Sequence, residues 1–355
     1  MTGFDVKEEI EQLRQAIDTN DVARVQELMT RNPTMHRAPL GYGEDGPLTW
    51  VAECRVPWEP PGPARLAIAT WMIEHGSDVH QGGDGPLMRA ALNGYRIPMM
   101  ELLVSHGADV NALWHGHFPI IFAPCESWAP EALAWLLDHG ADPNRCDPRQ
   151  AVLGEPFPGT ALDYLLGSYA RGPERLAACI DALLAAGGTT RYDAPAVLDL
   201  LRGRLDALAR QIDADPSLVG RRFPGLDCGM TGGRRLTLEG ATLLHVAAEY
   251  GQTAGAALLL DRGADVDAAA AVGEAGVGGQ TALFHAVSQF GDAGLDVARL
   301  LLDRGADVAV RAKLPGDYER PGEVVECTAL GYALRFGGDA DRPTVALLRG
   351  RGAAL

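Results

Sequence analysis

Side chains that could bind a metal or act in catalysis gather in one stretch of the sequence. His115 and His117 are followed by Cys125 and Glu126, and all of these residue types can coordinate Zn²⁺. A thiol at Cys125 with His117 as its base could also form a nucleophilic pair. However, the spacing matches no metal motif, and neither an orienting acid nor an oxyanion donor is identifiable. We therefore predict no catalytic residue, no metal site and no cofactor, and keep an enzyme only as the less favoured alternative.

Tryptophan and charged side chains accompany this stretch. Trp50, Glu53, Arg55 and Trp58 precede a stiff loop of prolines and one glycine at positions 60–63. Binding residues concentrate where a rigid scaffold presents such side chains. We predict binding roles for Trp50, Glu53, Arg55, Trp58, Arg89, Asn93, His115, His117, Cys125, Glu126, Tyr250 and Arg335. The alternative is a groove for a small molecule or substrate, bounded by Trp50, Trp58, Arg89, His115, His117 and Glu126.

A glycine-rich segment in the second half of the sequence has the composition of a phosphate-binding loop. Residues 229–235 read GMTGGRR, but they lack the Gly-Lys-Ser/Thr ending and do not follow a strand pattern. Arg221 and Arg222 come before them, so the loop at 220–240 is locally basic on an acidic protein. We interpret this loop as a finger that contacts a partner, with an ordinary solvated loop as the alternative.

The elements that would position these residues follow from a repeated phrase, a leucine-rich run that ends in Gly-Ala-Asp. Its copies start at Leu102, Leu136, Leu259 and Leu301. Self-similarity of this kind predicts stacked modules, not one closed globule. In the first copy, Met100, Leu103 and Val104 share one helix face, and Gly107 fits the left-handed end of that helix. Each phrase is therefore predicted to be the end of a helix followed by a turn.

A second, shorter helix pattern precedes most of these phrases. It reads TLLHVAAEYG from Thr242, TALFHAVSQFG from Thr281 and TALGYALRFG from Thr328. Threonine can cap such a helix, and the small alanines allow neighbouring helices to approach closely. Helix, turn, helix and Gly-Ala-Asp together resemble the ankyrin repeat, whose T-P-L-H-x-A signature is nearly matched at residues 242–247.

The resemblance implies an all-α solenoid of stacked helix-turn-helix units with extended hairpin or loop fingers. It also implies a structural role for His245, because the histidine at this position in the family bonds neighbouring backbone. Insertions between repeats predict long loops at 144–159, 268–279 and 313–327, which are rich in glycine, proline or charge. We expect these loops to extend beyond the helical stack.

The sequence also repeats on a larger scale, because residues 21–33 resemble residues 204–216. Each copy begins with an amphipathic helix pattern and ends at a proline. We predict an N-terminal ankyrin block at residues 1–190 that starts with an acidic capping helix. A C-terminal ankyrin block at residues 191–355 would then stack continuously on the first.

Composition limits the partners. The 355-residue chain has a formal net charge of -16 at pH 7, so phosphate backbones and anionic membranes repel it. No apolar run approaches the roughly 20 residues of a spanning helix, and the N-terminus lacks the apolar core of a secretory signal. The six cysteines are scattered, which predicts reduced thiols. We expect a cytoplasmic monomer that binds neither nucleic acid nor membrane, with the Ala-, Arg- and Gly-rich usage typical of a high-GC bacterium.

The resemblance further implies a non-enzymatic scaffold that binds a protein partner through its concave face and loop tips. Partners of this family usually touch the loop tips and the solvent-facing side of the first helices. On that side we place Glu53 and Cys54, Leu92 and Asn93, Cys125 and Glu126, Glu249 and Tyr250, Ser288 and Gln289, and Arg335 and Phe336. Because several of these residues are carboxylates, we expect a partner with basic character.

Overall fold

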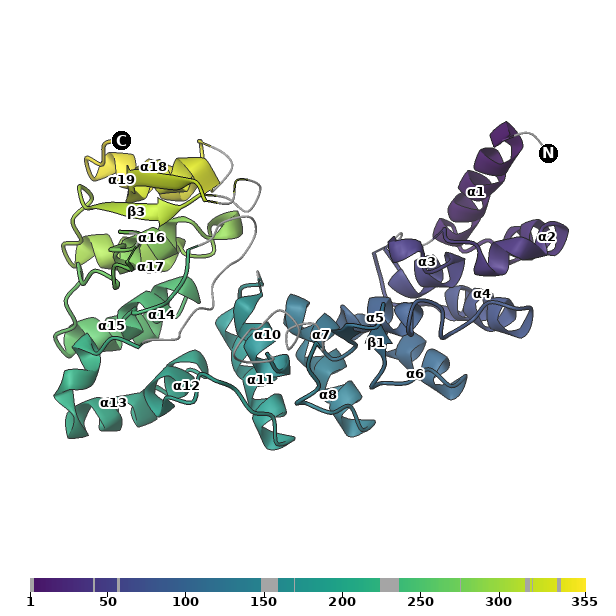
Figure 1. The fold of residues 1–355 in the computed structure, drawn as a ribbon, viewed down its shortest axis with the longest axis horizontal. Coiled ribbons are helices and arrows are strands. Elements are labelled where there is room, and N and C mark those ends of the chain that lie inside the picture. Colours follow the sequence, from purple (N-terminus) through teal and green to yellow (C-terminus); the bar gives the residue numbers. More distant parts are fainter. Residues whose placement is uncertain are drawn as a thin grey trace. The chain divides into compact units, whose positions relative to one another are not determined.

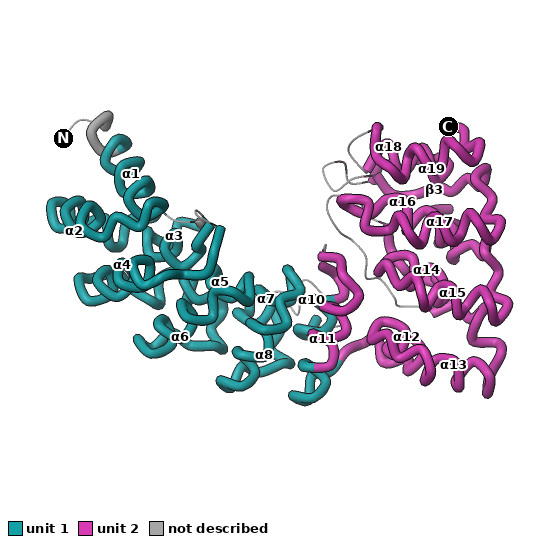
Figure 2. The backbone as a smooth tube through the Cα atoms, turned by 180° about the vertical axis from the view of Figure 1, so that it is seen from behind, with its two compact units in different colours: residues 1–165, 182–189 teal, residues 166–181, 190–355 magenta. Residues whose placement is uncertain are grey.

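Helices dominate the structure, which is a computed structural model. It describes residues 3–40, 42–55, 58–147, 159–168, 170–223, 236–274, 276–316, 320, 322–336 and 340–355. They follow one another in short pairs, and two small β-hairpins lie between pairs (Figure 1). The residues group into two compact units (Figure 2). Residues 1–165 with 182–189 form the N-terminal unit, and residues 166–181 with 190–355 form the C-terminal unit.

The N-terminal unit begins with α1 and α2 and continues with further helix pairs. Its helices are α1 (Gly3–Asp18), α2 (Val22–Arg31), α3 (Pro47–Glu53), α4 (Pro63–Glu74), α5 (Gly85–Ala91), α6 (Ile97–Ser105), α7 (Phe122–Ser127) and α8 (Pro130–Asp138). Short 3₁₀ turns are η1 (Pro33–Arg37), η2 (Tyr42–Glu44) and η3 (Gly94–Arg96). The antiparallel hairpin of β1 (Leu113–Trp114) and β2 (Phe118–Pro119) joins α6 to α7. Two helices, α10 (Ala161–Gly167) and α11 (Pro173–Ala185), contribute residues to both units.

The C-terminal unit repeats this order of elements. Its helices are α12 (Pro195–Leu201), α13 (Leu205–Ala214), α14 (Leu243–Glu249), α15 (Thr253–Asp261), α16 (Ala282–Val287), α17 (Leu295–Asp303), α18 (Ala329–Phe336) and α19 (Pro343–Gly350). Its 3₁₀ turns are η4 (Pro216–Gly220) and η5 (Phe290–Asp292), and its hairpin consists of β3 (Arg311–Pro315) and β4 (Val324–Thr328). Helices α2 and α13, each followed by a 3₁₀ turn that starts at a proline, occupy the two segments whose sequences resemble each other.

The helical repeat fold predicted from the sequence is confirmed, but one predicted loop is wrong. Residues 313–327 include parts of the two strands β3 and β4, which pair in antiparallel register. Ala312 and Leu314 are buried while Arg311 and Lys313 face solvent, the two-residue alternation of a strand with one covered face. The sequence signal was hidden because the segment between the strands is rich in glycine, proline and charge.

The other two predicted loops have different outcomes. The segment at 268–279 extends the sheet, since the Gly278 N–H donates to the Lys313 carbonyl at 2.7 Å and Val272 bridges Gly278. The loop predicted at 144–159 and the basic finger predicted at 220–240 lie largely outside the described residues.

Local sequence explains where the helices begin. Proline occupies the first turn of α3, α4, α5, α8, α12 and α19. Its fixed φ suits a first turn, and its missing N–H would have had no helical partner there. The Asp21 carboxylate caps α2 by accepting a bond from the Arg24 N–H at 3.0 Å. These signals act within a few neighbouring residues and need no tertiary contact.

Glycine closes the helix that precedes each Gly-Ala-Asp turn, as at Gly263 after α15. This residue has φ +87°, a left-handed conformation that only glycine adopts at little cost. The Gly263 N–H donates to the Leu260 carbonyl and the Ala264 N–H donates to the Leu259 carbonyl, both at 3.0 Å. This pattern satisfies the carbonyls at the end of the helix.

We expect Gly263→Val to lower the free energy of unfolding of the C-terminal unit by about 1–2 kcal/mol, the cost of the left-handed conformation for a residue with a side chain. No atom lies within 4 Å of a Cβ added at Gly263, so backbone strain would be the cause. Urea denaturation followed by circular dichroism measures the effect. Gly220→Val is the control, because Gly220 is equally open and has an ordinary φ. Equal stability of the two variants would mean that the helix end is assigned wrongly.

Asparagine side chains tie successive turns of the N-terminal unit together. Asn111 Nδ2 donates to the Gly140 carbonyl, and Asn111 Oδ1 accepts from the Asp142 N–H, both at 2.8 Å. Asn144 repeats the arrangement with the Gly187 carbonyl at 3.0 Å and the Thr189 N–H at 2.8 Å. Each turn thereby satisfies backbone groups of the next one, which fixes the spacing of the repeats.

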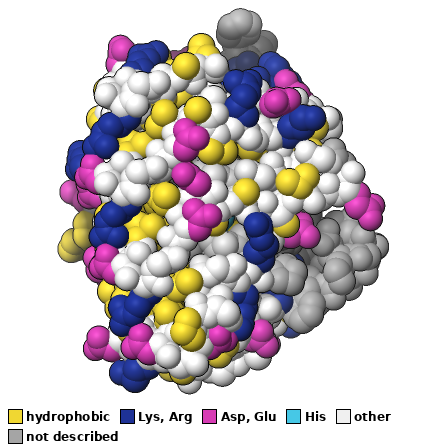
Figure 3. All heavy atoms as spheres, turned by 90° about the vertical axis from the view of Figure 1, so that its left-hand side faces the viewer, with side chains coloured by type: hydrophobic (Ala, Val, Ile, Leu, Met, Phe, Trp, Pro, Cys, Tyr) yellow, Lys and Arg dark blue, Asp and Glu magenta, His cyan; other side chains and the backbone are white. Residues whose placement is uncertain are grey.

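Arginine–aspartate ion pairs link successive repeats in the C-terminal unit. Each arginine at the end of a second helix reaches the aspartate of the preceding repeat, in the pairs Arg262–Asp213, Arg304–Asp261 and Arg351–Asp303. Figure 3 views the molecule from the side of the C-terminal unit. Basic and acidic side chains alternate along one edge of the surface that it shows. The pairs are solvent-exposed, so each contributes less than about 1 kcal/mol. In the part of the chain that is described, no helix is both long and apolar enough to cross a membrane.

Candidate functional site

The predicted binding residues lie mainly in the N-terminal unit, and Tyr250 and Arg335 lie in the C-terminal unit. First helices α3, α5 and α7 and the hairpin β1–β2 carry most of them. Successive first helices pack side by side, as α3 does with α5 and α5 with α7. The N-terminal unit is therefore the place where the predicted residues can form one surface.

Glu53 ends α3 and contacts two arginines. Its Oε1 accepts a bond from Arg89 Nη2 on α5 and lies 3.1 Å from Arg55 Nη2. The side chains of Glu53 and Arg89 are only 10% and 9% exposed, whereas that of Arg55 is 61% exposed. The Glu53 carboxylate is thus neutralised inside the unit, and the charge that remains accessible beside it belongs to arginine.

The C-terminal unit contains the same carboxylate–base pair at the matching position. Glu249 ends α14, and its Oε2 lies 2.7 Å from Nδ1 of His285 on α16. Both side chains are fully buried. Glu53–Arg89 and Glu249–His285 are each separated by 36 residues. Both pairs join the end of one first helix to the next first helix. The carboxylates therefore hold neighbouring repeats together.

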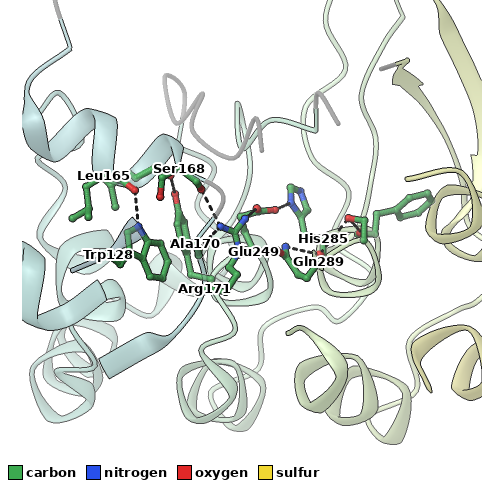
Figure 4. A network of polar contacts seen from close by, with 12 residues as sticks. Trp128, Leu165, Ser168, Ala170, Arg171, Glu249, His285 and Gln289 are labelled. Carbon is green, nitrogen blue, oxygen red and sulfur yellow. Dashed lines mark hydrogen bonds and ion pairs between the residues drawn. The ribbon is translucent and has the colours of Figure 1, made fainter. Parts of the chain in front are cut away.

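Arg171 completes the buried network in the C-terminal unit (Figure 4). Its Nη2 donates to Glu249 Oε1 and its Nε donates to Gln289 Oε1 at 2.6 Å. Its Nη1 donates to the Ser168 carbonyl at 3.0 Å and to the Ala170 carbonyl. The guanidinium also lies 5.7 Å from the Tyr250 ring centre. One arginine therefore fastens the segment before α11 to α14 and α16.

Several residues that we predicted on the solvent-facing side are buried instead. Cys125 and Tyr250 are 0% exposed, and the Tyr250 hydroxyl donates to the Leu166 carbonyl at 2.7 Å. Cys54, Glu249, Ser288 and Gln289 are also buried. The prediction of exposure at these positions was wrong, because the ends of the first helices face the adjoining repeat and not solvent.

Glu126 leads to a row of aromatic side chains in the N-terminal unit. Its Oε2 accepts a bond from the Tyr164 hydroxyl at 3.2 Å. The Tyr164 ring meets the Phe118 ring edge-on with centres 5.6 Å apart, and the Phe118 ring meets Trp114 at 5.9 Å. Phe122 is buried and stacks under Tyr164 at 4.5 Å. Trp114, Phe118 and Tyr164, which we call the aromatic row, are each partly exposed.

His115 and His117 hold the tip of the β1–β2 hairpin. His115 Nε2 lies 2.9 Å from Oδ1 of the buried Asp45, and Trp114 Nε1 donates to Asp45 Oδ2. Burial raises the pKa of the Asp45 carboxyl, and the bonds from Trp114 and His115 partly offset this rise. His117 Nδ1 donates to the His115 carbonyl at 3.0 Å. The two histidines therefore point to different partners, and the notion of a catalytic pair with Cys125 gains no support from their geometry.

Trp58 is the most exposed of the predicted aromatic residues. It is 59% exposed, and its ring centre lies 6.1 Å from that of Tyr95. The Arg96 guanidinium lies 5.2 Å from the Trp58 ring centre and 5.1 Å from the Tyr95 ring centre. Sequence reasoning missed Tyr95 and Arg96, although an aromatic residue next to an arginine is a signal that could have suggested them.

Of the remaining predicted residues, Asn93 contacts Arg96 through its backbone, and Trp50 and Arg335 have other partners. Trp50 lies under the Arg14 guanidinium at 5.8 Å from its ring centre. Asn93 is half-buried, and its carbonyl accepts a bond from the Arg96 N–H at 3.1 Å. Arg335 pairs with Glu323 at 2.5 Å in the C-terminal unit. The residues of the alternative small-molecule groove thus have separate partners.

Metal-ligating side chains are scattered. Within the described ranges, no group of three or more His, Cys, Asp or Glu residues could hold a metal ion. Cys54, Cys125, Cys179 and Cys327 are buried free thiols, and Cys228 lies outside the described residues. Burial raises the pKa of the Cys54 thiol, which keeps it in the less reactive protonated form.

His245 has the structural role that the family resemblance implied. Its Nδ1 lies 3.2 Å from the Thr242 N–H, which can only donate, so Nδ1 accepts and the proton resides on Nε2. Nε2 then donates to the Gln280 carbonyl at 3.0 Å. Burial, with smaller effects of His285 and Arg222, lowers the pKa of His245 from 6.5 to about 3. The neutral ring therefore links α14 to the turn before α16.

This lowered pKa predicts acid sensitivity of the C-terminal unit. The unfolded state binds a proton at His245 below pH 6.5 and the folded state does not, so stability is full above pH 6.5 and falls below it. Between pH 7.5 and 5 the free energy of unfolding should drop by about 2 kcal/mol from this residue. The measurement compares urea denaturation at both pH values for wild type and His245→Gln. Equal pH dependence in the two proteins would contradict the assignment.

Comparison with known proteins adds one family match. A family model described as ankyrin repeats, in three copies, matches residues 64–147 and 217–312, just over half of the chain. Among solved structures, the crystal structure of the human ASB11 ankyrin repeat domain is 21% identical in sequence with a TM-score of 0.35. That match covers 76% of this chain and 99% of the other. A search of curated proteins found no match.

Proposed function

This chain belongs to the ankyrin repeat family, and from that premise we propose that it is a non-enzymatic scaffold that binds a peptide segment of a protein partner. The proposed surface lies in the N-terminal unit and consists of the hairpin β1–β2 with the first helices α3, α5 and α7 and the start of α10, as far as Leu165. We call it the finger face. The family typically binds proteins through fingers and first helices, and the features below favour this unit.

The aromatic row is the observation that carries the proposal. Trp114, Phe118 and Tyr164 touch one another in edge-to-face contacts while each ring remains partly exposed. Rings held in this way lose little conformational freedom on binding, and aromatic residues dominate the energetics of interfaces. A partner that covers the row would bury apolar surface without first ordering it.

The supports under the row are rigid. Asp45 holds Trp114 and His115 from below, and a Cβ added at Gly82 would lie 2.0 Å from its Oδ1. The His115 N–H donates to the Gly82 carbonyl at 2.7 Å. The hairpin tip is thus locked onto the loop of the preceding repeat. A preorganised finger of this kind favours specific recognition.

One cavity beside α3 is too small for an organic ligand. The cavity lined by Asn20, Cys54, Glu59 and Arg65 has a volume of about 10 Å³, which holds one water molecule at most. An open surface can instead supply the approximately 800 Å² that each partner buries in a standard interface.

A selection of random peptides displayed on phage, with the full chain as bait, tests the proposal. We expect enriched peptides to protect β1, β2 and the start of α10 from hydrogen exchange. Phe118→Ser should weaken their binding by about tenfold or more through loss of a buried ring at the interface. Val324→Ser is the matched control, because Val324 is an exposed apolar residue of the other hairpin. The proposal would be contradicted if no peptide were enriched, or if Phe118→Ser and Val324→Ser weakened peptide binding equally.

A further inference from the structure

A buried arginine without an acidic partner lies beside the finger face. Arg96 in η3 is 1% exposed. Its Nη1 donates to the Arg89 carbonyl at 2.7 Å and its Nη2 donates to the Tyr95 hydroxyl at 3.1 Å, while its Nε has no acceptor. Among the described residues, no carboxylate lies within ion-pair distance of Arg96. Burial lowers the pKa of Arg96, and Glu53 offsets this only from beyond ion-pair distance. A buried charge held without a direct ion pair destabilises a fold, so a functional role would explain its presence.

Two aromatic rings cover this cation. The Trp58 and Tyr95 rings lie 5.2 and 5.1 Å from the Arg96 guanidinium. Rings at this distance stabilise a cation through their electron-rich faces. Trp58 is nonetheless 59% exposed, and tryptophan is enriched among the residues that dominate binding energy at interfaces. Arg96 and Tyr95 therefore fix the position of the Trp58 ring, and much of the ring remains exposed to solvent.

Arginines outnumber acids at this place. The Glu53 carboxylate pairs with Arg55 and Arg89, and Asp45 also acts on Arg89, whereas Arg96 forms no ion pair among the described residues. Asp18 and Glu59 instead act on Arg65. Arg55 is 61% exposed. The cluster therefore offers a positive surface group next to an open tryptophan ring, on a protein with a net charge of -16.

We propose that Arg55 and Trp58 bind an acidic side chain, Asp or Glu, within a peptide segment of the partner. The carboxylate bonds to the Arg55 guanidinium, and the apolar stem of the peptide lies on the Trp58 ring. Arg96 does not touch the peptide. It positions Trp58 and adds positive potential from a site that water does not screen.

The chemistry of the site selects this occupant over others. A chain-terminal carboxylate is usually captured by a nest of backbone N–H groups, whereas the groups offered here are guanidinium side chains. The inference rests on the proposed scaffold function and specifies its partner, which is locally acidic where we had expected basic character. That expectation rested on Glu53, Glu126 and Glu249. Glu53 and Glu249 are both satisfied inside their own units, and Glu126 accepts a bond from the Tyr164 hydroxyl.

The experiment uses the peptides enriched on the full chain. We expect them to share an Asp or Glu, and the synthetic Asp→Asn or Glu→Gln version to bind about tenfold more weakly, as for loss of one charge-assisted hydrogen bond. Arg55→Gln should remove this difference between the two versions. Arg299→Gln is the control, because Arg299 also forms an exposed ion pair but lies in the C-terminal unit.

Arg96→Met separates the positioning role from a merely structural one. If Arg96 supports acid recognition, the variant should keep or raise its melting temperature and lose most of the discrimination between the acidic and amide peptides. If Arg96 only supports the fold, the melting temperature should fall and the discrimination should persist, which would overturn its role. Circular dichroism confirms folding, and Trp58→Ala provides an independent test of the same surface.

The possible failures are distinguishable. Enriched peptides that lack a shared acid, or that bind Arg55→Gln and wild type with the same acid preference, would overturn the acidic site and leave the scaffold proposal standing. If no peptide is enriched on the full chain, both proposals fail.

Discussion

Replacing Arg171 with methionine is expected to lower the free energy of unfolding of the C-terminal unit by about 3–5 kcal/mol, the usual effect of removing one partner of a buried ion pair. Glu249, which is 0% exposed, would lose the Arg171 guanidinium and keep the His285 ring beside it. Gln289 Oε1 and the carbonyls of Ser168 and Ala170 would also lose their donor. These losses follow from desolvated groups left without partners.

Hydrogen exchange of the α14 and α16 backbone amides measures this loss of stability in the C-terminal unit itself. Arg299→Met is the matched control, because Arg299 pairs with Asp296 at the surface, where the side chains are 53% and 77% exposed. Exposed pairs of this kind contribute less than about 1 kcal/mol. If Arg171→Met and Arg299→Met had similar effects, the network in Figure 4 would not hold the unit together.

Leu301→Ala should destabilise the C-terminal unit by about 2–5 kcal/mol, because the substitution leaves a cavity between packed helices. Leu301 lies on α17 and is 0% exposed. The neighbouring Leu300 is only partly buried, so Leu300→Ala removes the same atoms from the surface of the same helix. We expect the control to have a much smaller effect.

The same comparison is available in the N-terminal unit. Leu103 on α6 is 0% exposed and Leu102 beside it is partly buried. Urea denaturation of Leu103→Ala and Leu102→Ala should reproduce the difference seen between Leu301 and Leu300. Equal losses at buried and half-buried leucines would show that these helices do not pack as described.

Local signals in the sequence were sufficient for the helical framework. Leu103, Leu301 and Gly263 were identified from spacing alone, since a 3.6-residue period and a left-handed glycine each have a direct physical cause. The structure places these leucines in the core and gives Gly263 φ +87°. The hairpin of β3 and β4 was missed, because short strands with only two buried side chains in β3 carry a weak alternation signal.

The sequence indicated the region of the candidate site, but it did not indicate which side chains in that region contact solvent and which are buried. Trp58 and Arg55 were chosen because of their types and neighbours, and the structure leaves both exposed. Cys125 and Tyr250 were chosen by the same logic, yet both are buried. Position within a repeat does not reveal which flank of a short helix faces the next repeat, because that depends on how the helices pack.

The amino-acid sequence by itself determined that this chain is a stack of helical hairpins, since helix periods, proline starts and glycine ends act over a few neighbouring residues. Only the tertiary structure decided how the charges are used. Glu53 and Glu249 were read as a surface for a partner, but packing brings a base 36 residues later against each of them. Packing also leaves Arg96 Nε without a hydrogen-bond acceptor. Pairing between distant residues depends on distances that no local pattern encodes.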